Sequence, residues 1–229
     1  LLLFVFWQKR LAARGEVGLM NLALFDVRSF AMGSLVSAIY GAALFGSTYL
    51  LPVYMQSALK LAPSLVGAIL LPAGLVLVVV IAIVGRLADK VPGYLLVTVG
   101  LALLASSFVS MDLVEPLSPL WLLVALSILG RVGLGFILPS LNIGAMRGLP
   151  KPMIAQGASV INFVRTLGGA AGVSLCGIAL EWRLQVHGDR LSNPVTTQAR
   201  LDAFGEVFWM LGLTCALAIL ASWKLREPS

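Results

Sequence analysis

Long segments without a charged residue constrain this chain more than any other feature of its sequence. The segments that contain no Asp, Glu, Lys or Arg at all are residues 29–59, 61–85, 91–111 and 207–223. Two further segments, 116–146 and 152–180, contain one arginine each, Arg131 and Arg165. A helix needs about 20 apolar residues to cross the hydrocarbon core of a bilayer. All six segments are long enough to do so.

These segments predict six membrane-spanning helices. Their expected ranges are 30–58, 64–85, 93–111, 119–141, 154–180 and 204–223. Barrel strands are excluded because they alternate in polarity over short segments, whereas these apolar runs are continuous. The composition agrees, since 59% of the residues are hydrophobic and 11% are charged, against about 25% charged residues in soluble domains. The expected fold class is therefore an all-α integral membrane bundle.

The net charge of +6 is explained by loop asymmetry, so it does not indicate nucleic-acid binding. Ten of the sixteen Lys and Arg residues fall on one side of the predicted membrane: Lys9, Arg10, Arg14, Arg28, Arg86, Lys90, Arg147, Lys151, Lys224 and Arg226. Four fall on the other side: Lys60, Arg183, Arg190 and Arg200. Cytoplasmic loops carry the excess of positive charge. We therefore expect the protein to lie in the inner or plasma membrane of the cell. Its cytoplasmic segments are expected to be residues 8–29, 86–92 and 142–153 and the tail 224–229.

The N-terminal region is interpreted as two segments. Residues 1–8 (LLLFVFWQ) are expected to be the end of a preceding transmembrane helix, with a short N-terminal anchor as the alternative. A signal peptide is excluded because its positive charge precedes the apolar run, and here the charge follows it. Residues 9–29 mix leucines with polar residues, which is typical of a cytoplasmic or interfacial linker; an ordinary loop is the alternative.

Enzymatic and metal-binding functions find no support in the residue types. His187 is the only histidine, so a His-based metal cluster or a Ser/His/Asp triad is not available within the membrane. Cys176 and Cys215 lie in apolar segments without a CxxC spacing, as small packing residues do. We expect no enzyme activity, no metal and no cofactor.

Polar side chains are concentrated in three of the six predicted helices. Helix 30–58 carries Tyr40, Tyr49 and Gln56, and the helices 119–141 and 154–180 carry Arg131, Asn162 and Arg165. A charge in the middle of a bilayer is costly unless it faces protein or water. These residues are candidates for a polar substrate cavity, while the alternative for each arginine is a purely structural role in helix packing or at an interface.

Small residues are expected to bring helices together. Gly168, Gly169 and Gly172 form a small-residue face on helix 154–180, which permits close helix approach in membranes.

Several segments in order resemble the major facilitator superfamily, specifically its fourteen-span drug:proton antiporters. The segments are LFGSTYLLPVYMQ, LVGAILLPAGL, GRLADK, RVGLGFILPSLN and INFVRTLGGAAGVSL. GRLADK is similar to the second copy of the family's cytoplasmic motif, which implies a gating loop at Gly85, Arg86, Asp89 and Lys90. The continuation Val-Pro-Gly-Tyr after Lys90 departs from the family pattern of a glycine and further basic residues.

The resemblance implies a specific function. The six helices would be the C-terminal bundle of a proton-coupled multidrug efflux transporter, paired with a missing N-terminal half. Its partners would be protons, a lipophilic small-molecule substrate and the lipid bilayer. The aromatic rings of Tyr40, Tyr49, Tyr54 and Phe136 would then face lipophilic cations, with core packing as the alternative. A six-helix channel or accessory subunit that acts as an oligomer is the alternative function.

Overall fold

The computed structural model describes residues 22–193 and 195–223. Its long helices are α2 (Arg28–Ser57), α3 (Pro63–Leu87), α4 (Gly93–Met111), α5 (Leu120–Met146), α6 (Ile154–Val186) and α7 (Gln198–Trp223). Two short 3-10 helices, η1 (Leu22–Asp26) and η2 (Lys151–Met153), precede α2 and α6. All six long helices are apolar enough and long enough to span a membrane. The prediction of an all-α six-helix membrane bundle is confirmed, whereas the expectations for residues 1–8, for most of the linker 9–29 and for the tail 224–229 lie outside the described residues.

Three helix ends differ by five or six residues from the expected ranges: α5 continues past residue 141 to Met146, and the other two lie next to the connection between α6 and α7. Helix α6 continues to Val186 and α7 already begins at Gln198. Hydropathy places a helix end where charges begin, but two of the charges here neutralise each other between the helices. Arg183 of α6 donates hydrogen bonds from two guanidinium nitrogens to the carboxylate of Glu206 on α7. The ion pair therefore allows both helices to extend past the apolar segment.

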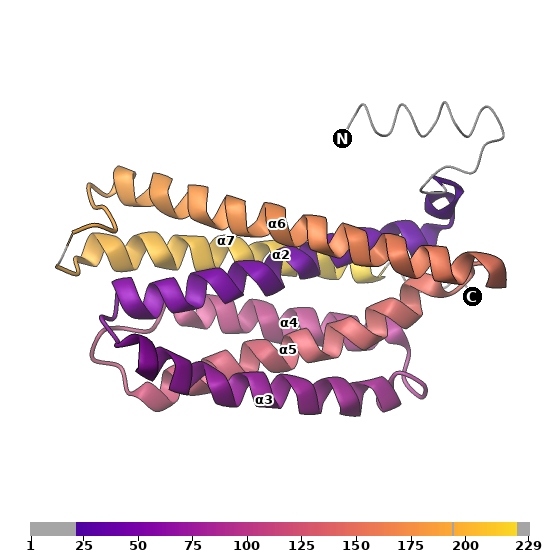
Figure 1. Ribbon diagram of the computed structural model, residues 1–229, viewed down its shortest axis with the longest axis horizontal. Coiled ribbons are helices and arrows are strands. Elements are labelled where there is room, and N and C mark those ends of the chain that lie inside the picture. The colour runs from indigo at the N-terminus through magenta and orange to yellow at the C-terminus, as the bar shows by residue number, and fades with distance from the viewer. Residues whose placement is uncertain (1–21, 194, 224–229) are drawn as a thin grey trace.

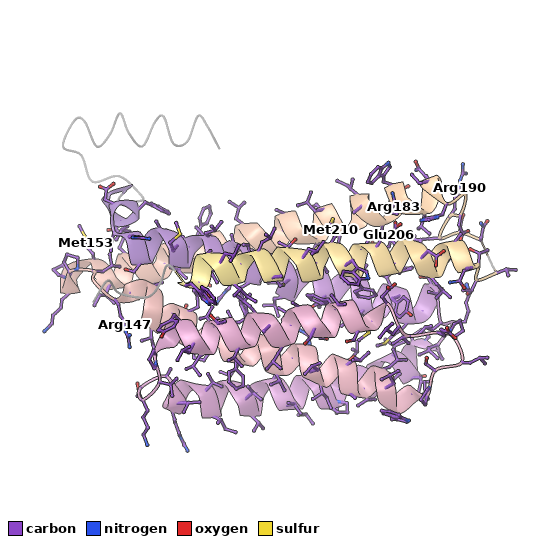
Figure 2. All side chains as sticks on the ribbon, turned by 180° about the vertical axis from the view of Figure 1, so that it is seen from behind. Arg147, Met153, Arg183, Arg190, Glu206 and Met210 are labelled. Carbon is purple, nitrogen blue, oxygen red and sulfur yellow. The ribbon has the colours of Figure 1, made fainter. Side chains whose placement is uncertain are left out.

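The helices are arranged in two layers. Helices α2, α3, α5 and α6 lie toward the viewer in Figure 1, and α4 and α7 lie in front in the reverse view of Figure 2. The most extensive contacts are between α2 and α6, between α4 and α5, between α3 and α5, and between α4 and α7. We call the side formed by α2, α3, α5 and α6 the front face.

Glycines set the distance between the two most closely packed helix pairs. A Cβ placed on Gly41 of α2 would lie 2.0 Å from the backbone oxygen of Arg165, and one on Gly168 of α6 would lie 2.3 Å from that of Ala38. Between α4 and α5, Gly100 and Gly133 face each other in the same way, each with the partner's carbonyl 2.7 Å from its hypothetical Cβ. Small residues let the two backbones approach closely, and this close approach adds to the van der Waals packing that holds membrane helices together.

Burial differs between the helices of the front face. Only 17% of the apolar window of α3 and 22% of that of α6 is buried, compared with 50% for α2 and for α7. The large exposed hydrophobic side chains of α3 are aliphatic and include Leu75, Val79 and Ile83. Helices α3 and α6 therefore present the largest uncovered surfaces of the bundle.

The two ends of the bundle differ in charge. The connections 88–92 and 147–153 carry exposed Lys90, Arg147 and Lys151, and we call this the basic end. The connections 58–62, 112–119 and 187–197 form the opposite end. Figure 2 shows Arg147 and Met153 at the basic end and Arg183, Arg190 and Glu206 at the opposite end.

Candidate functional site

Two arginines and a tyrosine from three helices meet near the middle of the front face. Tyr40 of α2, Arg131 of α5 and Arg165 of α6 each lie close to the midpoint of their helix. Both guanidinium groups act electrostatically on the Tyr40 phenol. Arg131 also reaches Thr48 of α2, whose hydroxyl oxygen accepts a long hydrogen bond of 3.5 Å from Nη2. We call these four residues, together with Asn162, the arginine cluster.

The guanidinium groups of the arginine cluster have few partners among the described residues. Arg165 donates to the side-chain oxygen of Asn162, one turn earlier on α6. Arg131 has only the long bond to Thr48. A guanidinium carries five N–H donors and keeps its charge in proteins, so most donors in the cluster remain available. Such a site attracts an anionic or hydrogen-bond-accepting group, or a carboxylate from another segment.

Local sequence explains why the cluster forms at this level. Gly41 follows Tyr40 and lies against the Arg165 backbone oxygen. Helices α2 and α6 therefore touch at the level of the helix axis from which the Tyr40 and Arg165 side chains project. On α5, the small residues Gly133 and Gly135 flank the same turn and pack against Leu104 and Val80. Close packing on both sides leaves Arg131 directed toward α2.

The remaining aromatic and amide candidates lie in several different places. Tyr54 is 2% exposed. It donates a hydrogen bond of 2.6 Å to the Val114 carbonyl and packs edge-on against Phe208. The structure therefore places Tyr54 in the core, which was the packing alternative. Phe136 is half-buried beside the small cluster of α3 and α4 that includes Val84. Neither the Tyr54 ring nor the Phe136 ring belongs to the arginine cluster.

Tyr49 and Gln56 lie further along α2 than the arginine cluster, toward the opposite end. Gln56 is exposed near the end of the helix. Tyr49 is half-buried and lines a pocket with the last turns of α6. The sequence-predicted cavity residues thus separate into the mid-helix cluster of Tyr40, Arg131, Asn162 and Arg165 and residues placed elsewhere.

The expected gating loop lies at the basic end. Gly85 and Arg86 belong to the last turn of α3, and Asp89 and Lys90 lie in the turn that follows. The turn is closed by backbone hydrogen bonds from Lys90 and Val91 to the Leu87 carbonyl. Asp89 is exposed, and among the described residues its carboxylate accepts no hydrogen bond and forms no ion pair. The Asp89 carboxylate is thus available for a contact with another segment.

The glycines predicted to mediate packing lie at the contact between α2 and α6. A Cβ on Gly172 would lie 2.4 Å from Cα of Ala42, and one on Gly169 would lie 2.3 Å from the ring of Phe45. Together with Gly168 they line the side of α6 that touches α2.

Sequence reasoning missed a buried charge network at the opposite end. Arg200 is completely buried and Asp189 is 2% exposed. Arg200 donates from Nε to Asp189 Oδ2 at 3.0 Å and from Nη2 to Oδ1 at 3.2 Å. It also donates to the carbonyl of Ser57 at the end of α2 at 3.0 Å. The connection between α6 and α7 is thereby fastened to α2.

The geometry of this network starts from the end of α6. Gly188 adopts the left-handed conformation with φ of 73°. Its N–H donates to the Gln185 carbonyl, and the N–H of Asp189 donates to that of Leu184 at 2.8 Å, which is the Schellman pattern of helix termination. The pattern turns Asp189 back toward α7. The Gly-Asp pair after an apolar helix was the signal in the sequence, but the sequence alone does not identify Arg200 as its partner.

The environment of Asp189 changes its acidity. Burial by itself raises the pKa of this carboxyl group, but hydrogen bonds from Arg200, Thr197, Asn193 and the Arg190 backbone outweigh burial and hold the pKa far below its usual range. The carboxylate is therefore charged under all physiological conditions.

A second charge cluster at the opposite end joins α6 to α7. Arg183 forms a salt bridge with Glu206, and His187 Nε2 lies 3.3 Å from the same carboxylate. Within the described part of the chain no three His, Cys, Asp or Glu side chains are placed so that they could hold a metal ion.

Comparison with known proteins identifies the fold. The sequence profile of the Major Facilitator Superfamily matches residues 3–173, which include α2 to α5 and more than half of α6. No curated protein sequence matches the chain. Members of this superfamily are membrane transporters, not enzymes, and transport implies a substrate. On the profile match and the six-helix bundle, this multi-pass membrane chain belongs to the Major Facilitator Superfamily.

Proposed function

We propose that the chain is the C-terminal bundle of a proton-coupled efflux transporter of the fourteen-span drug:proton antiporter type. The arginine cluster is the observation that carries this proposal. Charged side chains in the middle of a membrane helix mark substrate or ion pathways. Transporter binding sites lie near the bilayer midplane, at the interface between two repeats. The mid-helix positions of Arg131 and Arg165 on the front face fit such a site.

The uncovered surfaces of α3 and α6 support a second bundle as the partner. Both helices belong to the front face and have the least buried apolar windows. In our proposal the N-terminal half covers this face, and the two bundles rock about the arginine cluster to open it alternately to each side of the membrane. The positive-inside rule orients the bundle with its basic end in the cytoplasm.

Proton coupling in this proposal requires a carboxylate from the partner half. Glu206 is the one acidic residue that the described structure places well inside α7, and it is already bonded to Arg183 and His187. A partner carboxylate would pair with Arg131 or Arg165 when ionised and leave the pair when protonated. Lipophilic compounds would bind against the apolar walls of the same cavity.

Efflux from proteoliposomes that contain the complete transporter tests the proposal. An imposed pH gradient should drive export of the lipophilic cation ethidium. Arg131→Gln and Arg165→Gln should each lower the rate at least tenfold, because one charge-assisted contact is worth that much. Arg147→Gln, an exposed charge at the basic end, is the matched control and should retain the wild-type rate. Wild-type rates in both cluster variants would contradict the proposal.

A further inference from the structure

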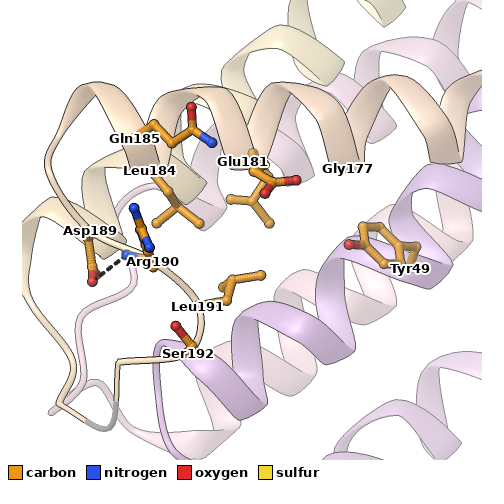
Figure 3. A pocket seen from close by; sticks show the side chains of 10 residues that line it. Tyr49, Gly177, Glu181, Leu184, Gln185, Asp189, Arg190, Leu191 and Ser192 are labelled. Atoms are coloured by element: carbon orange, nitrogen blue, oxygen red, sulfur yellow. Dashed lines mark hydrogen bonds between the residues drawn. The ribbon is translucent and has the colours of Figure 1, made fainter.

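A pocket of about 390 Å³ lies at the opposite end of the bundle, apart from the arginine cluster. Figure 3 shows Tyr49 of α2 on one side, the last turns of α6 on another, and the connection with Arg190, Leu191 and Ser192 closing the third. Leu180 and Leu184, which are 1% and 2% exposed, also line it. Its volume is within the range of small-molecule sites, which are about 300–1,000 Å³.

Two opposite charges line this pocket without being paired. Glu181 of α6 and Arg190 of the connection are exposed. In the described structure neither side chain forms a hydrogen bond or an ion pair, and no salt bridge joins them. The other ionised group of the pocket, Asp189, is occupied by Arg200. An unpaired carboxylate and an unpaired guanidinium therefore face one pocket with an apolar wall.

The backbone positions of both charged residues are set by the fold. Glu181 lies one turn after Gly177 on α6, and a Cβ on Gly177 would be 3.8 Å from the Tyr49 hydroxyl. The phenol therefore lies beside the same face of α6 as the carboxylate. The Arg190 backbone is held by two hydrogen bonds. Its N–H donates to the Asp189 carboxylate at 2.7 Å, and its carbonyl accepts from the Arg200 guanidinium at 2.7 Å. The backbone that carries both charged side chains is thus held in place beside the pocket.

We propose that this pocket binds a small amphoteric molecule that carries an ammonium group, a carboxylate and an apolar body. The ammonium pairs with Glu181 beside the Tyr49 phenol, the carboxylate pairs with Arg190, and the apolar body lies on Leu180, Leu184 and Leu191. A singly charged ligand satisfies one of the two groups and leaves the other unpaired. The inference rests on the proposed function, because it makes the pocket a subsite, at one end of the pathway, for those exported compounds that are zwitterions.

Binding of three dansyl probes to the full chain in nanodiscs tests this inference. Dansyl-lysine carries both charges, dansylcadaverine only the ammonium and dansylglycine only the carboxylate. We expect dansyl-lysine to bind about tenfold more tightly than either other probe. Glu181→Gln should weaken dansyl-lysine and dansylcadaverine about tenfold and leave dansylglycine unchanged. Arg190→Gln should weaken dansyl-lysine and dansylglycine and leave dansylcadaverine unchanged.

Glu115→Gln is the matched control, since Glu115 is an exposed carboxylate at the same end but outside the pocket. Equal affinities for the three probes, or losses in Glu181→Gln and Arg190→Gln no larger than in Glu115→Gln, would overturn the inference. The binding assay does not depend on transport. Charge-selective binding without pH-driven efflux would contradict the proposed function but support the zwitterion pocket. Efflux without charge-selective binding would support the proposed function but contradict the zwitterion pocket.

Discussion

Replacing Asp189 with asparagine should release the connection between α6 and α7 from the rest of the bundle. The substitution keeps the size of the side chain but removes the charge that compensates the fully buried Arg200. Arg200 would keep neutral acceptors, among them the carbonyls of Ser57 and of Arg190 at 3.0 and 2.7 Å. It would lose two charge-assisted bonds to the carboxylate.

The expected cost is about 3–5 kcal/mol, the loss typical of breaking a buried ion pair by removing one partner. The lower value applies here because the carbonyl acceptors remain. A loss of about 3 kcal/mol corresponds to more than a 100-fold change in an opening equilibrium. Residues 187–197 should open first, since the Asp189–Arg200 pair and the hydrogen bond from Thr196 to the Ala58 carbonyl tie them to α2.

Hydrogen exchange of residues 187–197, measured relative to the intrinsic exchange rate, checks this expectation. Exchange should rise more than 100-fold in Asp189→Asn. In the double variant Asp189→Asn/Arg200→Gln, residues 187–197 should lose less protection against exchange than the sum of the losses in the two single variants. The reason is that the double variant no longer buries an uncompensated charge. A change below tenfold in Asp189→Asn would show that the pair does not hold the connection, and the assignment would be wrong.

The dependence of this protection on pH is a second test of the role of Asp189. The folded pKa of Asp189 is lower than its unfolded value, which is near 3.9, so its contribution is fully present above about pH 4. The contribution is lost as the pH falls below that value toward the folded pKa. Protection of residues 187–197 should therefore decline in the wild type below about pH 4, and this part of the decline should be absent in Asp189→Asn.

Three further predictions follow from the packing and the charge distribution. Gly41→Ala should destabilise the bundle by about 1–3 kcal/mol in thermal unfolding, as overpacking does, because the new methyl would lie 2.0 Å from a backbone oxygen; Gly67→Ala, where no atom lies within 4 Å, should cost nothing. Gly188→Ala should cost about 1–2 kcal/mol through its φ of 73° alone, and an unchanged melting temperature would refute the Schellman assignment. Single cysteines in 88–92 and 147–153 should react with membrane-impermeant thiol reagents only from the cytoplasm, and cysteines in 187–197 only from outside; labelling of both sets from one side would refute the orientation.

The fold was predictable from sequence because membrane insertion depends on a property that single segments carry. Continuous apolar length identified all six helices, since backbone polar groups in lipid must be satisfied within the segment. The same criterion failed at the end of α6, where Arg183 and Glu206 neutralise each other between two helices. Hydropathy treats each charge separately and cannot anticipate a pair between segments.

The candidate site was predictable in part for the same reason. Arg131 and Arg165 stood out as isolated charges in apolar segments, but their common neighbour Tyr40 depends on how α2, α5 and α6 pack. Tyr54 is similar to Tyr40 in sequence context, yet it donates to the Val114 carbonyl in the core. The unpaired charges of Glu181 and Arg190 emerge only when the connection after α6 folds back over Tyr49.

Reconstitution of the chain alone and together with a complementary N-terminal bundle tests the central claim most directly. Proteoliposomes with both bundles should export ethidium when a pH gradient is imposed, and export should stop when a protonophore collapses the gradient. Proteoliposomes with residues 1–229 alone should show no gradient-driven export, because the front face has no partner against which to close. Gradient-driven export by the chain alone would contradict the two-bundle account and favour an oligomeric channel or subunit.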